Sequence, residues 1–167
     1  MTRRDGTRSK TSKTKNLHER ALGLLAVRSR SHSELERRLL YAGFDATEVS
    51  DELVRLEEVG LIDDDAFARQ VVEHEVGRRG SGQRRVASVL ARSGVSRPVL
   101  EGAIAGMDDS GEAERAGELA AARARRLGSL DPSKAYGRLT AYLMRRGYAP
   151  DVARVAARHA LEVDGVD

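Results

Sequence analysis

The residues best suited to chemistry in this 167-residue chain are arginines, which recur as adjacent pairs. Five pairs lie in the body of the sequence: Arg37 and Arg38, Arg78 and Arg79, Arg84 and Arg85, Arg125 and Arg126, and Arg145 and Arg146. Clustered pairs would form a basic groove for an acidic protein surface or a phosphate backbone. The same pairs would suit a solvated helix surface, where nearby glutamates neutralise them. The sequence leaves both interpretations open.

Groups that could support catalysis are scattered rather than clustered. The four histidines include no pair at metal-ligand spacing: His18, His32, His74 and His159. Three consecutive aspartates, residues 63–65, stand at a helix entrance, where caps are more common than metal sites. The turn at residues 80–82 lacks the lysine and hydroxyl of a nucleotide-binding loop, which favours a plain turn. We therefore predict no catalytic residue, no metal, no cofactor and no enzyme activity.

The N-terminal segment, residues 1–16, carries a dense positive charge. It has a net charge of +5, with one acidic residue against six basic ones: Arg3, Arg4, Arg8, Lys10, Lys13 and Lys15. Since the net charge of the whole chain is +3, the residues after this segment have a net charge of −2. A segment so poor in apolar residues cannot offset its ordering entropy, and we expect it to be disordered. It would serve as a nonspecific nucleic-acid arm or as a solubilising leader.

The composition indicates a helical protein. Alanine, leucine, arginine and glutamate are abundant, and the chain has only three prolines. It has no cysteine, which excludes disulfides and thiolate metal sites. No apolar run approaches the roughly 20 residues that a membrane helix needs, and the apolar core of a signal peptide does not follow the basic N-terminus. We expect a cytoplasmic protein without membrane contacts.

Three glycines mark an internal repeat. Gly43, Gly94 and Gly147 are 51 and 53 residues apart, and apolar residues stand at the same offsets from each. The positions eight before, four before and one after each glycine are Leu35, Leu39 and Phe44, then Val86, Leu90 and Val95, then Leu139, Leu143 and Tyr148. A helix, a glycine turn and a second helix in a shared register are typical of repeat proteins.

The repeat predicts an all-α fold of three tandem three-helix units after the tail, at residues 17–60, 61–108 and 109–167. Helix starts are predicted from capping side chains, namely Ser33 with Glu36, Asp45 with Glu48, Asp63, Asp64, and Asp131 before Pro132. Burial of the few apolar register positions in each unit would barely offset the backbone entropy that the unit loses on folding. Neighbouring units should therefore cover one another's apolar edges. The third unit holds alanines where the others have larger residues, and we expect it to bury least.

Beyond these patterns, the sequence resembles the RecX family of regulatory proteins over about residues 17–161. The motif residues that carry the resemblance are Gly60, Leu61, Ile62, Asp63, Asp64, Phe67, Ala68, Gly80, Gly82, Arg85, Leu90, Gly94, Val95, Leu139, Leu143, Arg145, Arg146, Gly147 and Tyr148. The resemblance implies three tandem three-helix repeats in an elongated, curved, solenoid-like arrangement. It also implies binding of the RecA recombinase filament on single-stranded DNA and inhibition of its growth, ATPase and strand exchange.

Under this resemblance, the partner contacts are expected among the arginine pairs of all three units. We expect these contacts to be Arg37, Arg38, Arg84, Arg85, Arg145 and Arg146. A curved body of three units could touch several filament subunits at once, and multivalency would raise its affinity. Nothing in the sequence indicates an obligate dimer, so we expect a monomer.

Two other functions remain open from the sequence alone. Helix pairs could act as helix-turn-helix readers of single- or double-stranded DNA, with the basic tail on phosphate. Side chains that would read base edges are few, since the only Asn and Gln residues are Asn16, Gln70 and Gln83. The chain could instead be a scaffold for another helical partner. Binding that survives high salt would indicate an apolar interface rather than an arginine groove.

Overall fold

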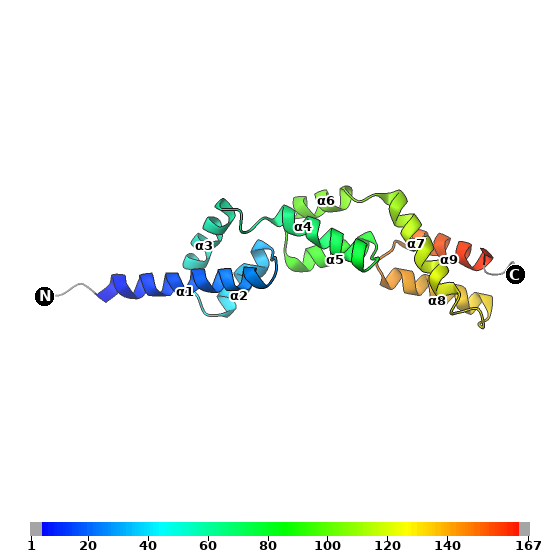
Figure 1. The fold of residues 1–167 in the computed structure, drawn as a ribbon, viewed down its shortest axis with the longest axis horizontal. Helices are drawn as coiled ribbons and strands as arrows, with labels where there is room; N and C mark the ends of the chain where they lie inside the picture. The colour runs from blue at the N-terminus through cyan, green and yellow to red at the C-terminus, as the bar shows by residue number, and fades with distance from the viewer. Residues whose placement is uncertain (1–4, 164–167) are drawn as a thin grey trace.

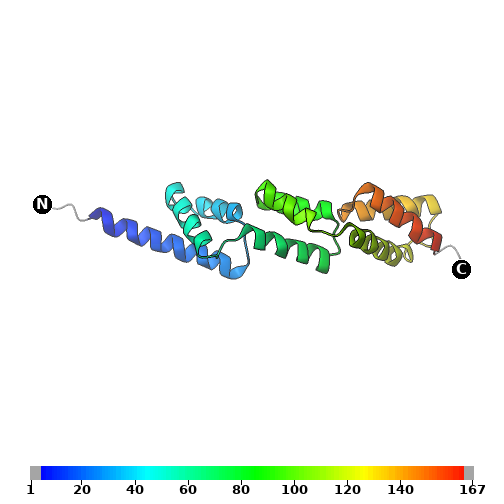
Figure 2. The same cartoon turned by 90° about the horizontal axis from the view of Figure 1, so that it is seen from above.

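The structure is a computed structural model that describes the backbone of residues 5–163 and the side chains of residues 16–162. Over residues 5–163 it contains helices α1 to α9, one π-helix, η1, and no strand. The helices follow one another along an elongated body, with α1 at one end and α9 near the other (Figure 1). A view turned by 90° shows the same linear order (Figure 2). The predicted all-α repeat fold is confirmed.

The first unit consists of α1 (Asp5–Val27), α2 (His32–Tyr41) and α3 (Ala46–Glu58). Each helix packs against the other two. Their apolar faces form one cluster of eight buried residues: Leu17, Ala21, Leu35, Leu39, Val49, Leu53, Leu56 and Ile62. Since Ile62 belongs to this cluster, the first unit extends slightly past the predicted boundary at residue 60.

The α1 helix begins earlier than the sequence analysis predicted. It starts at Asp5, within the segment where disorder was expected, rather than at Leu17. No proline interrupts residues 5–16, and extending a helix that is already nucleated costs much less than starting one. The helix that Leu17 and Ala21 anchor in the core can therefore continue toward the N-terminus. Residues 1–4, and the side chains of residues 1–15, lie outside the described part of the chain.

The second unit consists of α4 (Asp64–Val72), η1 (Glu73–Arg78), α5 (Gln83–Ser93) and α6 (Arg97–Ala105). Its buried cluster is the smallest of the three: Phe67, Ala68, Val86, Leu90 and Val95. None of these residues comes from α6, whose apolar side chains are only half-buried. The η1 segment continues α4 with the wider π geometry, which often marks functional sites.

The third unit consists of α7 (Asp109–Ala124), α8 (Pro132–Arg145) and α9 (Pro150–Val163). It buries twelve residues, more than either other unit: Ala116, Ala120, Ala124, Leu127, Ala135, Leu139, Leu143, Tyr148, Ala153, Ala156, Ala157 and Ala160. The expectation that this unit buries least is therefore wrong. Small alanine side chains let the helix backbones approach one another, so α9 packs against both α7 and α8.

Most of the predicted helix starts agree with the structure. The side chains of Asp45, Asp63 and Asp131 each accept hydrogen bonds from backbone amides in the first turn of α3, α4 and α8. The start of α2 differs, because the capping residue is Ser31 rather than Ser33. The Ser31 hydroxyl accepts from the Glu34 amide at 3.1 Å.

The three register glycines end the second helix of each unit in the left-handed region, with φ of +87° at Gly43, +76° at Gly94 and +93° at Gly147. The positions eight and four residues before each glycine are completely buried, which confirms the register: Leu35, Leu39, Val86, Leu90, Leu139 and Leu143. The positions directly after the glycines are buried at Val95 and Tyr148. Each unit therefore closes its core around the same helix and turn.

The glycine turns also join the units. At the first joint, between the first and second units, the turn at Gly94 lies against Ser33 at the start of α2. The Ser31 hydroxyl donates to the Ser93 carbonyl, and the His32 amide donates to Asp64 Oδ1 at 2.8 Å.

The second joint, between the second and third units, repeats this arrangement. Gly147 lies against the start of α5, where the Gly82 amide donates to the Arg146 carbonyl and the Arg84 amide donates to the Gly147 carbonyl, both at 3.0 Å. The Tyr148 hydroxyl donates to the Gly80 carbonyl, also at 3.0 Å. Burial raises the pKa of this hydroxyl, which keeps it protonated as a donor.

The contacts between units are mainly polar, which the sequence analysis did not predict. The three apolar clusters are separate, and the helix pairs that pack most extensively all lie within one unit. The expectation that neighbouring units cover one another's apolar edges is therefore wrong. Each unit closes its own core, and the joints leave polar side chains facing one another.

Replacing Gly147 by alanine is expected to destabilise the protein more than replacing Gly43. Both glycines have positive φ, so either alanine should lower the free energy of unfolding by about 1 to 2 kcal/mol. A Cβ at Gly147 would also overlap the backbone of Arg85, whereas a Cβ at Gly43 meets nothing within 4 Å. Measured by urea unfolding, Gly147→Ala should therefore lower the free energy of unfolding by about 1 to 3 kcal/mol more than Gly43→Ala does. Equal losses would contradict the close joint.

Candidate functional site

Each joint carries a hollow lined by arginines. The first hollow lies at the first joint, and its lining is Arg20, Leu24, Glu34, Arg37, Arg38, Tyr41, Ala42, Val89, Arg92 and Ser93. The second hollow lies at the second joint, and its lining is Glu75, Arg78, Arg79, Ser81, Arg85, Arg145 and Arg146. The tertiary structure therefore gathers arginines that are far apart in the sequence at two places along the molecule.

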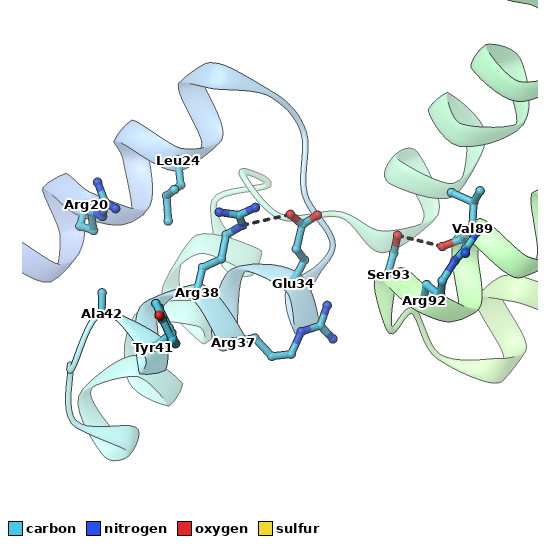
Figure 3. Close-up of a pocket in the computed structure, with 10 residues that line it drawn as sticks. All are labelled: Arg20, Leu24, Glu34, Arg37, Arg38, Tyr41, Ala42, Val89, Arg92 and Ser93. Carbon is cyan, nitrogen blue, oxygen red and sulfur yellow. Dashed lines mark hydrogen bonds and ion pairs between the residues drawn. The ribbon is translucent and has the colours of Figure 1, made fainter.

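The first hollow is bounded by three helices from two units. Figure 3 shows Arg20 on α1 and Arg37 and Arg38 on α2, with Arg92 and Ser93 of α5 across from them. The hollow encloses about 820 Å³, which leaves room for several side chains of a partner. Its walls combine guanidinium groups with apolar side chains such as Leu24.

Glu34 organises the charges of the first hollow. One oxygen of its carboxylate accepts hydrogen bonds from Arg28 Nη2 and Arg30 Nη1 at 2.5 Å and from Arg38 Nε at 3.2 Å. Burial by itself would raise the pKa of Glu34. The hydrogen bonds from Arg38 and Arg28 and the charges of Arg28 and Arg30 outweigh burial and hold the pKa below its usual range. Glu34 therefore stays ionised and fixes Arg38 at the rim.

Tyr41 is the most exposed aromatic side chain near the site, and sequence reasoning missed it. Its side chain is 97% exposed, and Leu40 beside it is 40% exposed. Both follow Leu39, a buried register position, so the repeat itself indicates that they point away from the core. Arg20 and Arg92 were also missed, because each stands alone in the sequence and the analysis looked for pairs.

Glu75 organises the second hollow. Its side chain is only 6% exposed, and its Oε2 accepts a hydrogen bond from the Ser81 hydroxyl at 2.8 Å. It forms ion pairs with Arg79 Nη1 at 3.5 Å and with Arg85 Nε at 3.7 Å. A single buried carboxylate in η1 thus holds two guanidinium groups at the base of the hollow.

The third unit supplies the opposite wall of the second hollow. Arg146 Nη1 donates to the Arg79 carbonyl, and its guanidinium carbon lies 5.4 Å from the centroid of the Tyr142 ring. Arg145 lines the same hollow, as does Arg78 from η1. Within residues 16–162, neither Arg78 nor Arg145 forms an ion pair.

The structure brings together most of the predicted contact residues. Arg37 and Arg38 line the first hollow. Arg85, Arg145 and Arg146 line the second, and Arg78 and Arg79, which were noticed as a pair but not chosen as contacts, join them. Arg84 is exposed on α5 and lines neither hollow. The six basic residues predicted for the tail have side chains outside the described residues: Arg3, Arg4, Arg8, Lys10, Lys13 and Lys15.

The other sequence candidates have structural roles. Asp63 caps α4, and Asp64 accepts the His32 amide at the first joint. The amides of Gly82 and Arg84 donate to the third unit, so they are not free to form a phosphate cradle. Among residues 16–162, no group of three or more acidic or histidine side chains could hold a metal ion. No helix of the described chain is long and apolar enough to cross a membrane.

Comparisons with known proteins point to one family. A model of the third three-helix domain of RecX matches residues 111–156. The regulatory protein RecX of Mycolicibacterium vanbaalenii is 38% identical over 138 residues, which cover 79% of this chain and 75% of that protein. Its counterpart in Mycobacterium sp. (strain JLS) is 36% identical over 150 residues, covering 87% of this chain and 81% of that protein. The crystal structure of RecX from Lactobacillus salivarius shares the fold, with a TM-score of 0.81 at 19% identity, covering 92% of this chain and 99% of that one.

The Glu34→Gln variant tests the charge network of the first hollow. It is expected to lose about 1.5 to 3 kcal/mol of unfolding free energy near neutral pH, because the ionised carboxylate accepts three guanidinium hydrogen bonds. The folded-state pKa of Glu34 lies below the value in the unfolded chain. The stabilisation is therefore fully present above about pH 4.3 and is lost as the pH falls through the lowered folded-state pKa.

Urea unfolding as a function of pH measures this difference. The matched control is Glu36→Gln on the same helix, because Glu36 forms no ion pair within residues 16–162. The control should change the free energy of unfolding by no more than about 0.5 kcal/mol. A Glu34→Gln loss that is constant across this pH range would contradict the assigned network.

Proposed function

Since the chain belongs to the RecX family of regulatory proteins, we propose that it binds the RecA recombinase filament on single-stranded DNA and inhibits filament growth, ATP hydrolysis and strand exchange. The geometric observation that supports this proposal is the pair of arginine-lined hollows, one at each joint of an elongated body. The protein acts by binding its partner, and it needs no catalytic group or cofactor of its own.

The linear arrangement of the units suits a filament, which repeats the same surface along its length. A helix of about twelve residues is roughly 18 Å long, and three units follow one another in line (Figure 1), so the hollows at the two joints lie at separate points along the molecule. Each hollow can then meet a different filament subunit. Contacts that are individually weak combine into a useful affinity when they act together.

Six arginines are proposed as the contacts with RecA: two line the first hollow, three line the second, and one lies on α5 outside both. These residues are Arg37, Arg38, Arg84, Arg85, Arg145 and Arg146. Guanidinium groups form directional hydrogen bonds with carboxylates and with phosphates. Acidic side chains of RecA are the proposed counterpart at the first hollow, and anionic groups of the filament, phosphates included, are the proposed counterpart of the arginines near the second.

The first hollow is the better suited of the two to a folded protein surface. It combines arginines with the apolar walls of Leu24 and Val89 and with the fully exposed ring of Tyr41. Tyrosine and arginine are the residue types that most often carry the binding energy of protein interfaces. We place the principal protein contact there, and Tyr41 adds to the residues proposed from sequence.

The basic tail is proposed to contact DNA close to the filament. Its six basic residues are Arg3, Arg4, Arg8, Lys10, Lys13 and Lys15. This part of the proposal rests on charge alone, and such contacts are nonspecific and weaken steeply with added salt. The protein is proposed to act as a monomer.

RecA ATP hydrolysis on single-stranded DNA is the direct test of the proposed function. Substoichiometric amounts of the protein are expected to suppress hydrolysis while its binding to bare DNA stays weak. A variant lacking residues 1–16 measures the contribution of the tail. If hydrolysis falls only when the protein saturates the DNA, competition for the strand explains the effect, and the DNA-binding alternative replaces the proposal.

The double variant Arg37→Ala, Tyr41→Ala tests the first hollow as the protein contact. Removal of two interface anchors is expected to weaken inhibition of RecA ATP hydrolysis at least about tenfold. Both side chains are exposed and neither forms an ion pair within residues 16–162, so the fold should be unchanged. The control is Arg125→Ala, Arg126→Ala, which removes exposed arginines that line neither hollow. Inhibition that is equally strong in both variants would place the contact elsewhere.

A further inference from the structure

We propose that the second hollow is a phosphate-binding site whose ligand bridges the second and third units. The hollow gathers five guanidinium groups around one carboxylate, which gives its lining a net charge of +4. Like charges gathered so closely repel one another, and an anion in the hollow relieves that repulsion. The site has a volume of about 440 Å³, which is ample for one or two phosphate groups with water.

The guanidinium groups are held in place before any ligand arrives. Glu75 is buried and pairs with Arg79 and Arg85, while the Ser81 hydroxyl fixes the carboxylate from behind. Arg146 is held by the Arg79 carbonyl and by the face of the Tyr142 ring. Because these side chains are already ordered, an anion that binds them loses little affinity to the ordering of side chains.

Two further arginines have no anionic partner in the described chain. Arg78 and Arg145 line the hollow from opposite units, and neither forms an ion pair within residues 16–162. Their donors are therefore free for a ligand. Arginine binds phosphate through two parallel hydrogen bonds, so two free arginines can grip one phosphate group from both sides.

The lining favours phosphate over a protein surface. The second hollow contains arginines, one serine and one glutamate, without any apolar side chain. A protein contact normally buries apolar atoms at its centre, as the walls of the first hollow would allow through Leu24, Val89 and Tyr41. A small, highly charged and fully polar ligand matches the second hollow better. The two hollows are thus suited to different chemistry.

A bound phosphate would hold the second joint closed. Arg78, Arg79 and Arg85 come from the second unit, whereas Arg145 and Arg146 come from the third. A ligand that contacts both sets adds to the two backbone hydrogen bonds that already join Gly82 to Arg146 and Arg84 to Gly147. Because the two sets of arginines meet only in the folded protein, the ligand should raise the stability of the protein by mass action.

This inference adds a ligand chemistry that the proposed function does not require. It concerns the free protein and would hold whether or not the chain inhibits RecA. The phosphate can come from a free polyphosphate or from the backbone of a nucleic acid, which present the same oxygens to the arginines.

Calorimetric titration with inorganic pyrophosphate tests the site, with short single-stranded oligothymidylate as a second ligand and polyglutamate as a third. The test variant is Arg78→Ala, Arg145→Ala, which removes two exposed side chains that hold nothing else in place. The variant is expected to bind pyrophosphate at least about tenfold more weakly, while its circular dichroism spectrum is unchanged. The control is Arg125→Ala, Arg126→Ala, which removes the same charge outside the hollow and should bind as the unaltered protein does.

The ligands separate the sources of phosphate. If the test variant loses affinity for pyrophosphate alone, the site binds free phosphate groups. If the variant also loses affinity for oligothymidylate, the site binds a nucleic-acid backbone as well. The inference would be overturned if pyrophosphate did not bind, if the control lost as much affinity as the test variant, or if polyglutamate bound the hollow more tightly than either phosphate ligand. None of these results depends on RecA ATP hydrolysis, so failure here is distinct from failure of the proposed function.

Discussion

The structure depends on a glycine turn that lies close against a neighbouring helix at each joint. A left-handed glycine at the end of one unit's second helix lies against the first turn of the corresponding helix in the preceding unit, at Gly94 against Ser33 and at Gly147 against Arg85. A Cβ at either glycine would overlap its neighbour. The same residue type thus ends a helix and sets the distance between units, so the repeat in sequence becomes a repeat in space.

The polar character of the joints follows from the way each unit closes its core. The three apolar clusters are separate, and little apolar surface remains to be shared between units. Side chains around the joints can therefore be charged without disturbing a core. Carboxylates stabilise this arrangement, because the half-buried Glu34 at the first joint and the buried Glu75 at the second each form ion pairs with two or more guanidinium groups.

The two hollows share this origin but differ in their walls. The first includes Leu24, Val89 and the exposed Tyr41, so it resembles the centre of a protein interface. The second is entirely polar, and two of its arginines have no partner within residues 16–162. A regulator built in this way can use one joint to recognise a protein and another to respond to an anion. The linear body keeps the two sites apart.

The sequence by itself determined the helical class, the three-unit register and the residues that bury it, because helical periodicity and left-handed glycines are local properties. The buried pairs Leu35 and Leu39, Val86 and Leu90, and Leu139 and Leu143 all follow from offsets to a glycine. It also identified Arg37, Arg38, Arg85, Arg145 and Arg146 as candidates.

The grouping of these arginines was decided only by the tertiary structure, because pairs more than fifty residues apart in sequence meet when one unit docks on the next. Tyr41, Arg20 and Arg92 entered the site for the same reason, and Arg84 stayed outside both hollows although it is adjacent to Arg85 in sequence. Successive positions on a helix point about 100° apart, so which member of a pair faces a joint depends on how the units pack.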